Sequence, residues 1–182
     1  PYVVADEFVS IRDVLKSYLI TFQGFFRLIR YIKKNKKKFY IKKKNCRSIL
    51  EPLLLSSFSG EIQSQILIGL GIKNFLKQNK IKTFITYAEF NPGIRSIYPF
   101  IRNTNNQIKI VSIQHGHSNE NLLFFRHKKK EFSKDLRKDG SYFSPSPDIY
   151  FTQGAQYNKI LKKYFPRKTN IIGCLKYDIY NF

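Results

Sequence analysis

The sequence predicts an α/β fold, with a Rossmann-like parallel sheet and flanking helices. From residue 59 onward, short runs of β-branched and aromatic residues alternate with segments of helical periodicity. Because strand–helix–strand connections are right-handed, such strands belong in one parallel sheet. The 182 residues are 42% hydrophobic and 16% aromatic, which is enough apolar surface for a packed core and excludes a disordered chain.

The N-terminal part of the chain predicts a basic helical segment. Apolar residues recur at helical spacing over 9–32, which indicates an amphipathic helix that Gly24 would loosen. The Lys-rich stretch 33–47 follows, and because like charges repel we expect a solvated loop or helix end there. Contact of this stretch with anionic lipid is the alternative, since each nearby Lys or Arg contributes about 1 kcal/mol.

A second helix is expected over 59–80, where Ser59 is a candidate N-cap and Gly69 and Gly71 allow close packing on a sheet. The strand at 108–114 is almost entirely apolar, which indicates an interior strand that is buried on both faces. The other expected elements are a strand at 81–89, a helix at 91–102 with a break near Pro99, a strand at 148–152, a helix at 155–165 and a strand that opens 170–178 and turns at Gly173.

The balance of charge and the cysteines limit the classes of function only loosely. Lysine and arginine (33) outnumber aspartate and glutamate (12), so the net charge is +21. Such a charge attracts nucleic acid, anionic membrane and phosphorylated substrates alike, and a biased overall composition explains it equally well. Cys46 and Cys174 are far apart and predict neither a disulfide framework nor a zinc site, which favours a reducing, cytoplasmic location. No run of about 18 apolar residues predicts a membrane-spanning helix.

Polar side chains follow the ends of two predicted strands. Glu89 ends the strand at 81–89, and His115 follows the strand at 108–114. If these strands are neighbours, both side chains face one cleft at the carboxyl edge of the sheet, where ligands of parallel sheets bind. A histidine with a pKa of about 6.5 can take a proton from a hydroxyl, and a carboxylate orients its ring. The residues around His115 that are suited to bind a substrate are Gln114, Gly116, His117 and Asn119.

Other interpretations of these histidines stay open. His115 can equally cap the strand and bond to the backbone. Metal binding is not predicted, because His115 and His117 have no third ligand at metal spacing. The third histidine, His127, lies in a Lys-rich stretch and is expected to be solvated.

Two glycines follow predicted strands nearer the C-terminus. Gly154 stands between a strand and a helix, and Gly173 follows the last strand. Such glycines let backbone N–H groups and a helix N-terminus meet a phosphate, although an ordinary turn explains each of them as well. The long glycine motifs of dinucleotide and P-loop sites are not present.

The order of these motifs resembles a known family. "YAE" ends one strand, "QHG" ends the strand after the next helix, and "PDIYFTQG" and "IIGCLKYD" follow. This order resembles bacterial surface-polysaccharide biosynthesis proteins that look like glycosyltransferases of the two-Rossmann-domain (GT-B) type. A related pattern occurs in the CDP-glycerol glycerophosphotransferase group. The resemblance covers roughly 70–178.

The resemblance implies roles for individual residues. His115 matches the presumed base of the strand-end motif, and Glu89 matches its acidic partner. Gly154, Gly173 and Lys176 match the donor-binding half. Lys176 stands where the family pattern has arginine, so a two-pronged contact with phosphate becomes a single point charge.

The resemblance also implies two domains. Residues 1–140 correspond to an acceptor-side Rossmann-like domain, which opens with the basic helical segment 1–50. Residues 141–182 correspond to the truncated start of a donor-side domain. Because a complete GT-B enzyme has two domains of roughly 150 residues each, we expect this chain to be a fragment that is inactive alone.

We therefore expect an enzyme that transfers a sugar from a nucleotide-sugar to the hydroxyl of a lipid-linked or saccharide acceptor. It would need no cofactor and no tightly bound metal, and it would work in the cytoplasm, with the inner face of the cell membrane as a further contact. A glycerophosphotransferase or a sugar-nucleotide epimerase on the same fold is an alternative. A basic nucleic-acid-binding protein is a less favoured one, because none of the common RNA- or DNA-binding motifs is present.

Overall fold

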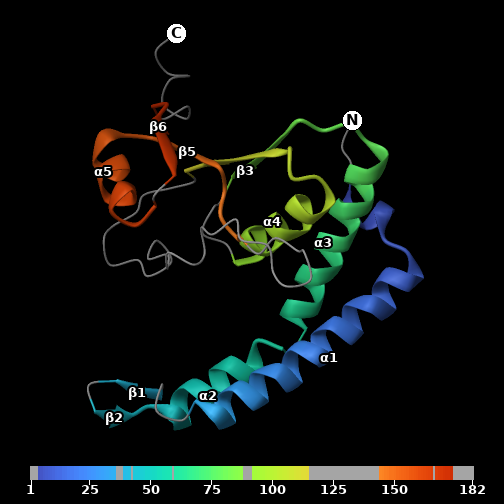
Figure 1. Cartoon of the computed structure of the whole chain (residues 1–182), viewed down its shortest axis with the longest axis vertical. Coiled ribbons are helices and arrows are strands. Elements are labelled where there is room, and N and C mark those ends of the chain that lie inside the picture. Colours follow the sequence, from blue (N-terminus) through green and yellow to red (C-terminus); the bar gives the residue numbers. More distant parts are fainter. Residues whose placement is uncertain are drawn as a thin grey trace. The chain divides into compact units, whose positions relative to one another are not determined.

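The computed structural model describes residues 4–35, 39–41, 43–58, 60–87, 92–114, 144–165 and 167–173. The chain divides into two compact units, the helical unit (Pro1–Asn74) and the sheet unit (Phe75–Phe182) (Figure 1). The division falls within α3 (Glu61–Gln78). This helix confirms the one expected over 59–80.

The helical unit is built around α1 (Ile11–Lys34), a helix of 24 residues that confirms the one expected over 9–32. A short 3-10 turn, η1 (Ala5–Phe8), precedes it. The Ser10 hydroxyl accepts a hydrogen bond from the Asp13 N–H (3.2 Å), and the Asp13 carboxylate accepts one from the Ser10 N–H (3.0 Å). This capping box satisfies two of the backbone donors that the start of a helix leaves open.

The Lys-rich stretch contains a small hairpin. β1 (Tyr40–Ile41) pairs antiparallel with β2 (Lys44–Asn45), and Lys43 in the turn has a φ of 68°. α2 (Arg47–Ser56) follows directly, with Pro52 inside it. The sequence predicts neither element, because two-residue strands are too short to show a periodicity and an interior proline argues against a helix.

Two helix glycines in the helical unit permit close packing. A Cβ atom at Gly71 would lie 2.4 Å from the carbonyl oxygen of Ala5, so this glycine packs against η1. The sequence instead predicts packing of Gly71 on a sheet. A Cβ atom at Gly24 would lie 3.2 Å from the ring of Phe58. α1 is continuous through Gly24, and the glycine makes room for an aromatic ring.

The sheet unit has four strands in the order β3-β4-β5-β6, and every neighbouring pair is parallel (Figure 1). Its elements after α3 are β3 (Thr83–Tyr87), α4 (Pro92–Thr104), β4 (Lys109–Ile113), β5 (Ile149–Thr152), α5 (Ala155–Tyr164) and β6 (Lys168–Ile171). This arrangement confirms the α/β class and the Rossmann-like parallel sheet. β4 lies between two strands, and Ile110, Val111 and Ser112 are buried in it, so the predicted interior strand is also confirmed.

α4 and α5 cover the same face of this sheet. Thr86 in β3, Ser112 in β4 and Tyr150 in β5 are register partners, so their side chains share a face. The hydroxyl of Tyr98 in α4 lies 2.8 Å from that of Thr86, and Tyr150 makes an edge contact with Phe165 at the end of α5. Right-handed crossovers between strands in sequential order require this placement of both helices.

α4 continues through Pro99, so the break predicted there is wrong. Proline removes one hydrogen bond of a helix and crowds the preceding turn. The neighbouring side chains of Tyr98 and Ile101 are fully buried, and their packing against the sheet outweighs the local cost.

The four-stranded sheet includes residues from both sides of position 141, where the sequence predicts the start of a second domain. β5 pairs with β4, and β6 pairs with β5. Within the described residues, 144–173 therefore complete the sheet that 83–113 begin.

Candidate active site

The carboxyl ends of β3 and β4 lie side by side. Tyr87, the last residue of β3, is the register partner of Ile113, the last residue of β4. Glu89 comes two residues after the first of these ends and His115 two residues after the second. The condition for a shared cleft, that the two strands are parallel neighbours, is thus met. Glu89, His115, Gly116, His117 and Asn119 themselves lie outside the described residues.

Gln114 links the ends of β4 and β5. Its side chain is only 3% exposed, and its Oε1 accepts a hydrogen bond from the backbone N–H of Gln153 (2.8 Å). The Nε2 of Gln153 in turn donates to the carbonyl oxygen of Gln114 (3.0 Å). This reciprocal pair fixes the backbone at the residue from which the chain continues to His115. The side-chain oxygen of Gln114 is therefore engaged inside the protein.

Gly154 stands at the N-terminus of α5, on the same edge of the sheet. It is the N-cap residue of α5, and as a glycine it has no side chain that could cap the helix. Among the described residues, no atom lies within 4 Å of the place where a Cβ atom at Gly154 would stand. The N-terminus of a helix attracts anions through its N–H groups and its dipole.

Gly173 closes the same edge after β6. Its φ is 76°, in the left-handed region that glycine adopts without strain. The backbone leaves the extended conformation here, and the residues after Gly173 lie outside the described ones. Lys176, the third residue assigned to donor binding, lies outside the described residues.

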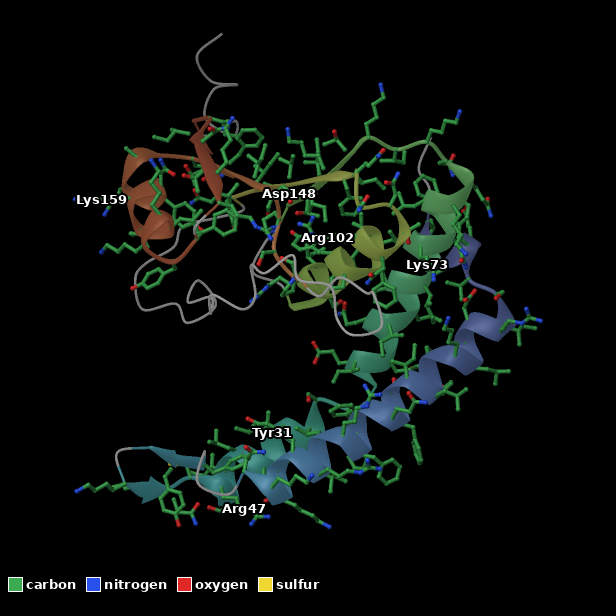
Figure 2. All side chains as sticks on the ribbon, in the orientation of Figure 1. Tyr31, Arg47, Lys73, Arg102, Asp148 and Lys159 are labelled. Atoms are coloured by element: carbon green, nitrogen blue, oxygen red, sulfur yellow. The ribbon has the colours of Figure 1, made fainter. Side chains whose placement is uncertain are left out.

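The opposite, amino-terminal edge of the sheet holds a largely buried ionic cluster that the sequence motifs do not predict. Asp148, just before β5, accepts a hydrogen bond from the Ile110 N–H (2.9 Å) and forms an ion pair with Arg102 of α4 (3.1 Å) (Figure 2). Arg167, just before β6, lies 3.6 Å from the same carboxylate and donates to the hydroxyl of Ser144 (3.0 Å). One carboxylate thereby ties α4, β4, β5 and the start of β6 together.

This cluster holds two guanidinium groups for one carboxylate. Burial and, after it, the charge of Arg102 lower the pKa of Arg167, while Asp148 acts in the opposite direction. The Nε atom of Arg102 is buried and has no hydrogen-bond partner among the described residues. The guanidinium group of Arg102 also donates a hydrogen bond to the carbonyl oxygen of Ser146 (2.7 Å). The arrangement is that of a structural tie across the sheet.

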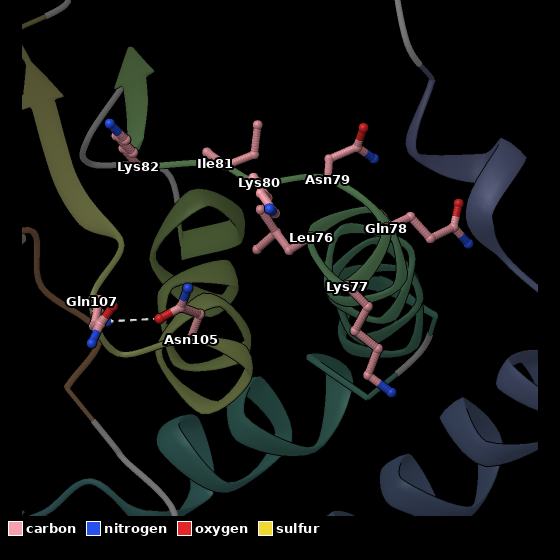
Figure 3. A pocket seen from close by; sticks show the side chains of 9 residues that line it. All are labelled: Leu76, Lys77, Gln78, Asn79, Lys80, Ile81, Lys82, Asn105 and Gln107. Atoms are coloured by element: carbon pink, nitrogen blue, oxygen red, sulfur yellow. Dashed lines mark hydrogen bonds between the residues drawn. The ribbon is translucent and has the colours of Figure 1, made fainter.

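A hollow of about 640 Å³ also lies at the amino-terminal edge. Its lining consists of Leu76, Lys77, Gln78, Asn79, Lys80, Ile81, Lys82, Asn105 and Gln107 (Figure 3). Figure 3 shows Lys77 and Lys82 pointing in opposite directions, so the ammonium groups do not converge on one ligand. The groups that the sequence assigns to chemistry follow the strands at the other edge, and we place the candidate site there.

Within the described residues, no group of three or more His, Cys, Asp or Glu side chains could hold a metal ion.

The chain was also compared with known proteins. Protein-family models, curated proteins and solved structures yielded no match. The assignment of a function therefore depends on the motifs and on the geometry of the sheet edge.

Proposed function

We propose that this chain belongs to a glycosyltransferase-like protein of surface polysaccharide assembly, with the GT-B arrangement of two Rossmann-like domains. It transfers a sugar from a nucleotide-sugar to an acceptor hydroxyl. The observation that supports this most is the pairing of β3 with β4: two parallel neighbours end at one edge, and the chain continues from one to a glutamate and from the other to a histidine.

His115 is the proposed base. Its neutral ring takes the proton of the acceptor hydroxyl while the hydroxyl oxygen forms a bond to the anomeric carbon of the donor sugar. The bond from that carbon to the phosphate oxygen breaks, and the nucleoside diphosphate leaves with the electron pair. Glu89 accepts a hydrogen bond from the ring, which sets its orientation and stabilises the protonated form.

The donor phosphates are proposed to lie at the N-terminus of α5. Gly154 caps that helix without a side chain, and the helix dipole favours the negative charge that develops on the leaving group. Gly173 and Lys176 follow the neighbouring strand and complete the donor side. The order of the sheet supports this grouping, since β5 and β6 are adjacent and parallel.

The same sheet edge suits a glycerophosphotransferase or a sugar-nucleotide epimerase. A substrate panel separates them: sugar transfer consumes a nucleotide-sugar and needs an acceptor, glycerophosphate transfer consumes CDP-glycerol, and epimerisation needs no acceptor. Transfer of a sugar to an added saccharide acceptor is the outcome that we propose.

The test is single-residue replacement in the protein expressed from its complete reading frame. His115→Ala should lower kcat by roughly 10²–10⁴, which is the usual contribution of a general base. His117→Ala should cost less, and His127→Ala, in the Lys-rich stretch, should leave kcat unchanged. Equal and small losses from the first two replacements would show that His115 only ends a strand and would contradict the proposal.

A further inference from the structure

One face of α1 is apolar and exposed to solvent. The stripe residues have between 45% and 82% of their surface exposed, and they are Ile11, Leu15, Tyr18, Leu19, Phe22 and Phe26. Residues three and four apart share a face of a helix, so these six form one continuous row, which we call the α1 stripe. A contiguous exposed apolar surface of this kind marks a site of interaction.

α1 packs within the helical unit through a different face. Ser17 and Ile32 are buried, and Ser17 accepts a hydrogen bond from the Nε2 of Gln63 in α3 (3.2 Å). Gly24 approaches the ring of Phe58 just beyond α2. On the helical wheel Ser17 and Gly24 lie on the side of α1 away from the stripe. The contacts of α1 inside the unit therefore leave the large apolar side chains of the α1 stripe exposed.

A row of basic side chains runs beside the α1 stripe. Arg12, Lys16 and Arg27 each come directly after a stripe residue, so they lie about 100° further around the helix. All six basic residues of α1 are exposed: Arg12, Lys16, Arg27, Arg30, Lys33 and Lys34. The one acidic residue of α1, Asp13, is engaged in the capping box and accepts a hydrogen bond from Asn74 (3.0 Å).

This combination of an apolar stripe and uncompensated positive charge fits an anionic lipid surface. A helix that lies in a membrane interface buries an apolar face among the acyl chains and presents Lys and Arg to the head groups. A second copy of the chain fits less well, because pairing two α1 stripes brings two basic rows together without carboxylates between them. None of the helices that the structure describes is long and apolar enough to cross a membrane.

We propose that α1 binds the surface of an anionic membrane, with the α1 stripe inserted at the boundary between head groups and acyl chains. Tyr18, Phe22 and Phe26 suit this boundary, since aromatic rings favour the membrane interface. The proposal concerns the helical unit and does not depend on the transfer reaction assigned to the sheet edge.

Co-sedimentation of the 182-residue chain with lipid vesicles tests the proposal. The vesicles consist of phosphatidylcholine alone or of phosphatidylcholine with an equal part of phosphatidylglycerol. The chain should bind the anionic vesicles at least about tenfold more tightly, and added salt should weaken this binding. Leu19→Gln removes one stripe side chain without a change of charge and should weaken binding to anionic vesicles about tenfold.

Gln23→Ala is the matched control, because Gln23 is exposed one helical turn after Leu19 and lies outside the stripe. It should leave binding unchanged, and far-UV circular dichroism should show both variants folded. Equal binding to the two kinds of vesicle, or equal effects of the two replacements, would overturn the proposal. A dimer in light scattering that Leu19→Gln dissociates, together with no vesicle binding, would assign the stripe to a second copy and would also overturn it.

Discussion

Leu19 in α1 and Leu161 in α5 are both leucines of amphipathic helices, yet Leu19 is 64% exposed and Leu161 is fully buried. In the sheet unit, Leu161 joins Tyr150, Tyr157 and Phe165 in a cluster between α5 and the sheet. In the helical unit, α1 buries Ser17 and Ile32 and leaves the six large side chains of the α1 stripe exposed. Helical periodicity therefore shows that a face is apolar, but not what covers it.

An ion pair of the helical unit is also more exposed to solvent than one of the sheet unit. Arg47 and Glu51 in α2 are 2.6 Å apart, and each side chain is about a third exposed. Arg102 and Asp148 in the sheet unit are 3.1 Å apart, and Arg102 is 5% exposed. The shorter contact is the less important one, because water screens it and would solvate either partner if the pair were broken. Water cannot solvate a buried charge in this way when its partner is removed.

Removing the carboxylates of these two pairs should give the largest difference in stability. Asp148→Ala leaves Arg102 and Arg167 buried without a carboxylate, so it should lower the free energy of unfolding by about 3–5 kcal/mol. Glu51→Ala should lower it by no more than about 0.5 kcal/mol. Urea denaturation of the two variants provides the measurement. Similar losses from both would show that the cluster at Asp148 is no tie between elements.

A smaller effect is expected at the start of α1. Ser10→Ala removes the capping hydroxyl and should lower the free energy of unfolding by about 1 kcal/mol at neutral pH. The hydrogen bond from the Ser10 side chain is the main cause of the lowered pKa of Asp13. A carboxylate with a lowered pKa in the folded state stabilises it above the unfolded pKa, and this contribution is lost as the pH falls through the folded value. The difference between wild type and Ser10→Ala should therefore shrink on acidification below about pH 4, the usual range of aspartate. A difference that stays constant to lower pH would show that the capping box does not involve the charged carboxylate.

The sequence predicts the elements that local pattern determines. The apolar run at 108–114 indicates β4 and its interior position, since only a strand covered on both faces is apolar at successive residues. The break predicted at Pro99 is wrong, and Pro52 also lies inside a helix. Their local cost is evident in the sequence, whereas the packing that offsets it at α4 comes from residues far away in the chain.

The candidate site also has features that the sequence indicates and contacts that it does not. The sequence leaves the pairing of β3 with β4 as a condition, although consecutive strands of a sheet are neighbours in most proteins. The bond between Gln114 and Gln153 joins residues 39 positions apart, and the pair of Arg102 with Asp148 joins residues 46 apart. Contacts over such separations leave no signal in spacing or composition. They appear only once the strands are in register.

The most direct test of the contrast between the two units is the free energy of unfolding of Leu19→Ala beside that of Leu161→Ala. Both replacements remove the same atoms from a helix and keep a good helix former in place. Leu161→Ala should lower the free energy of unfolding by about 2–5 kcal/mol, since it leaves a cavity between α5 and the sheet. Leu19→Ala should change stability by no more than about 0.5 kcal/mol, as expected of a surface position. A loss at Leu19 as large as the loss at Leu161 would contradict the account, because the α1 stripe would then be part of a core and not a surface for a partner.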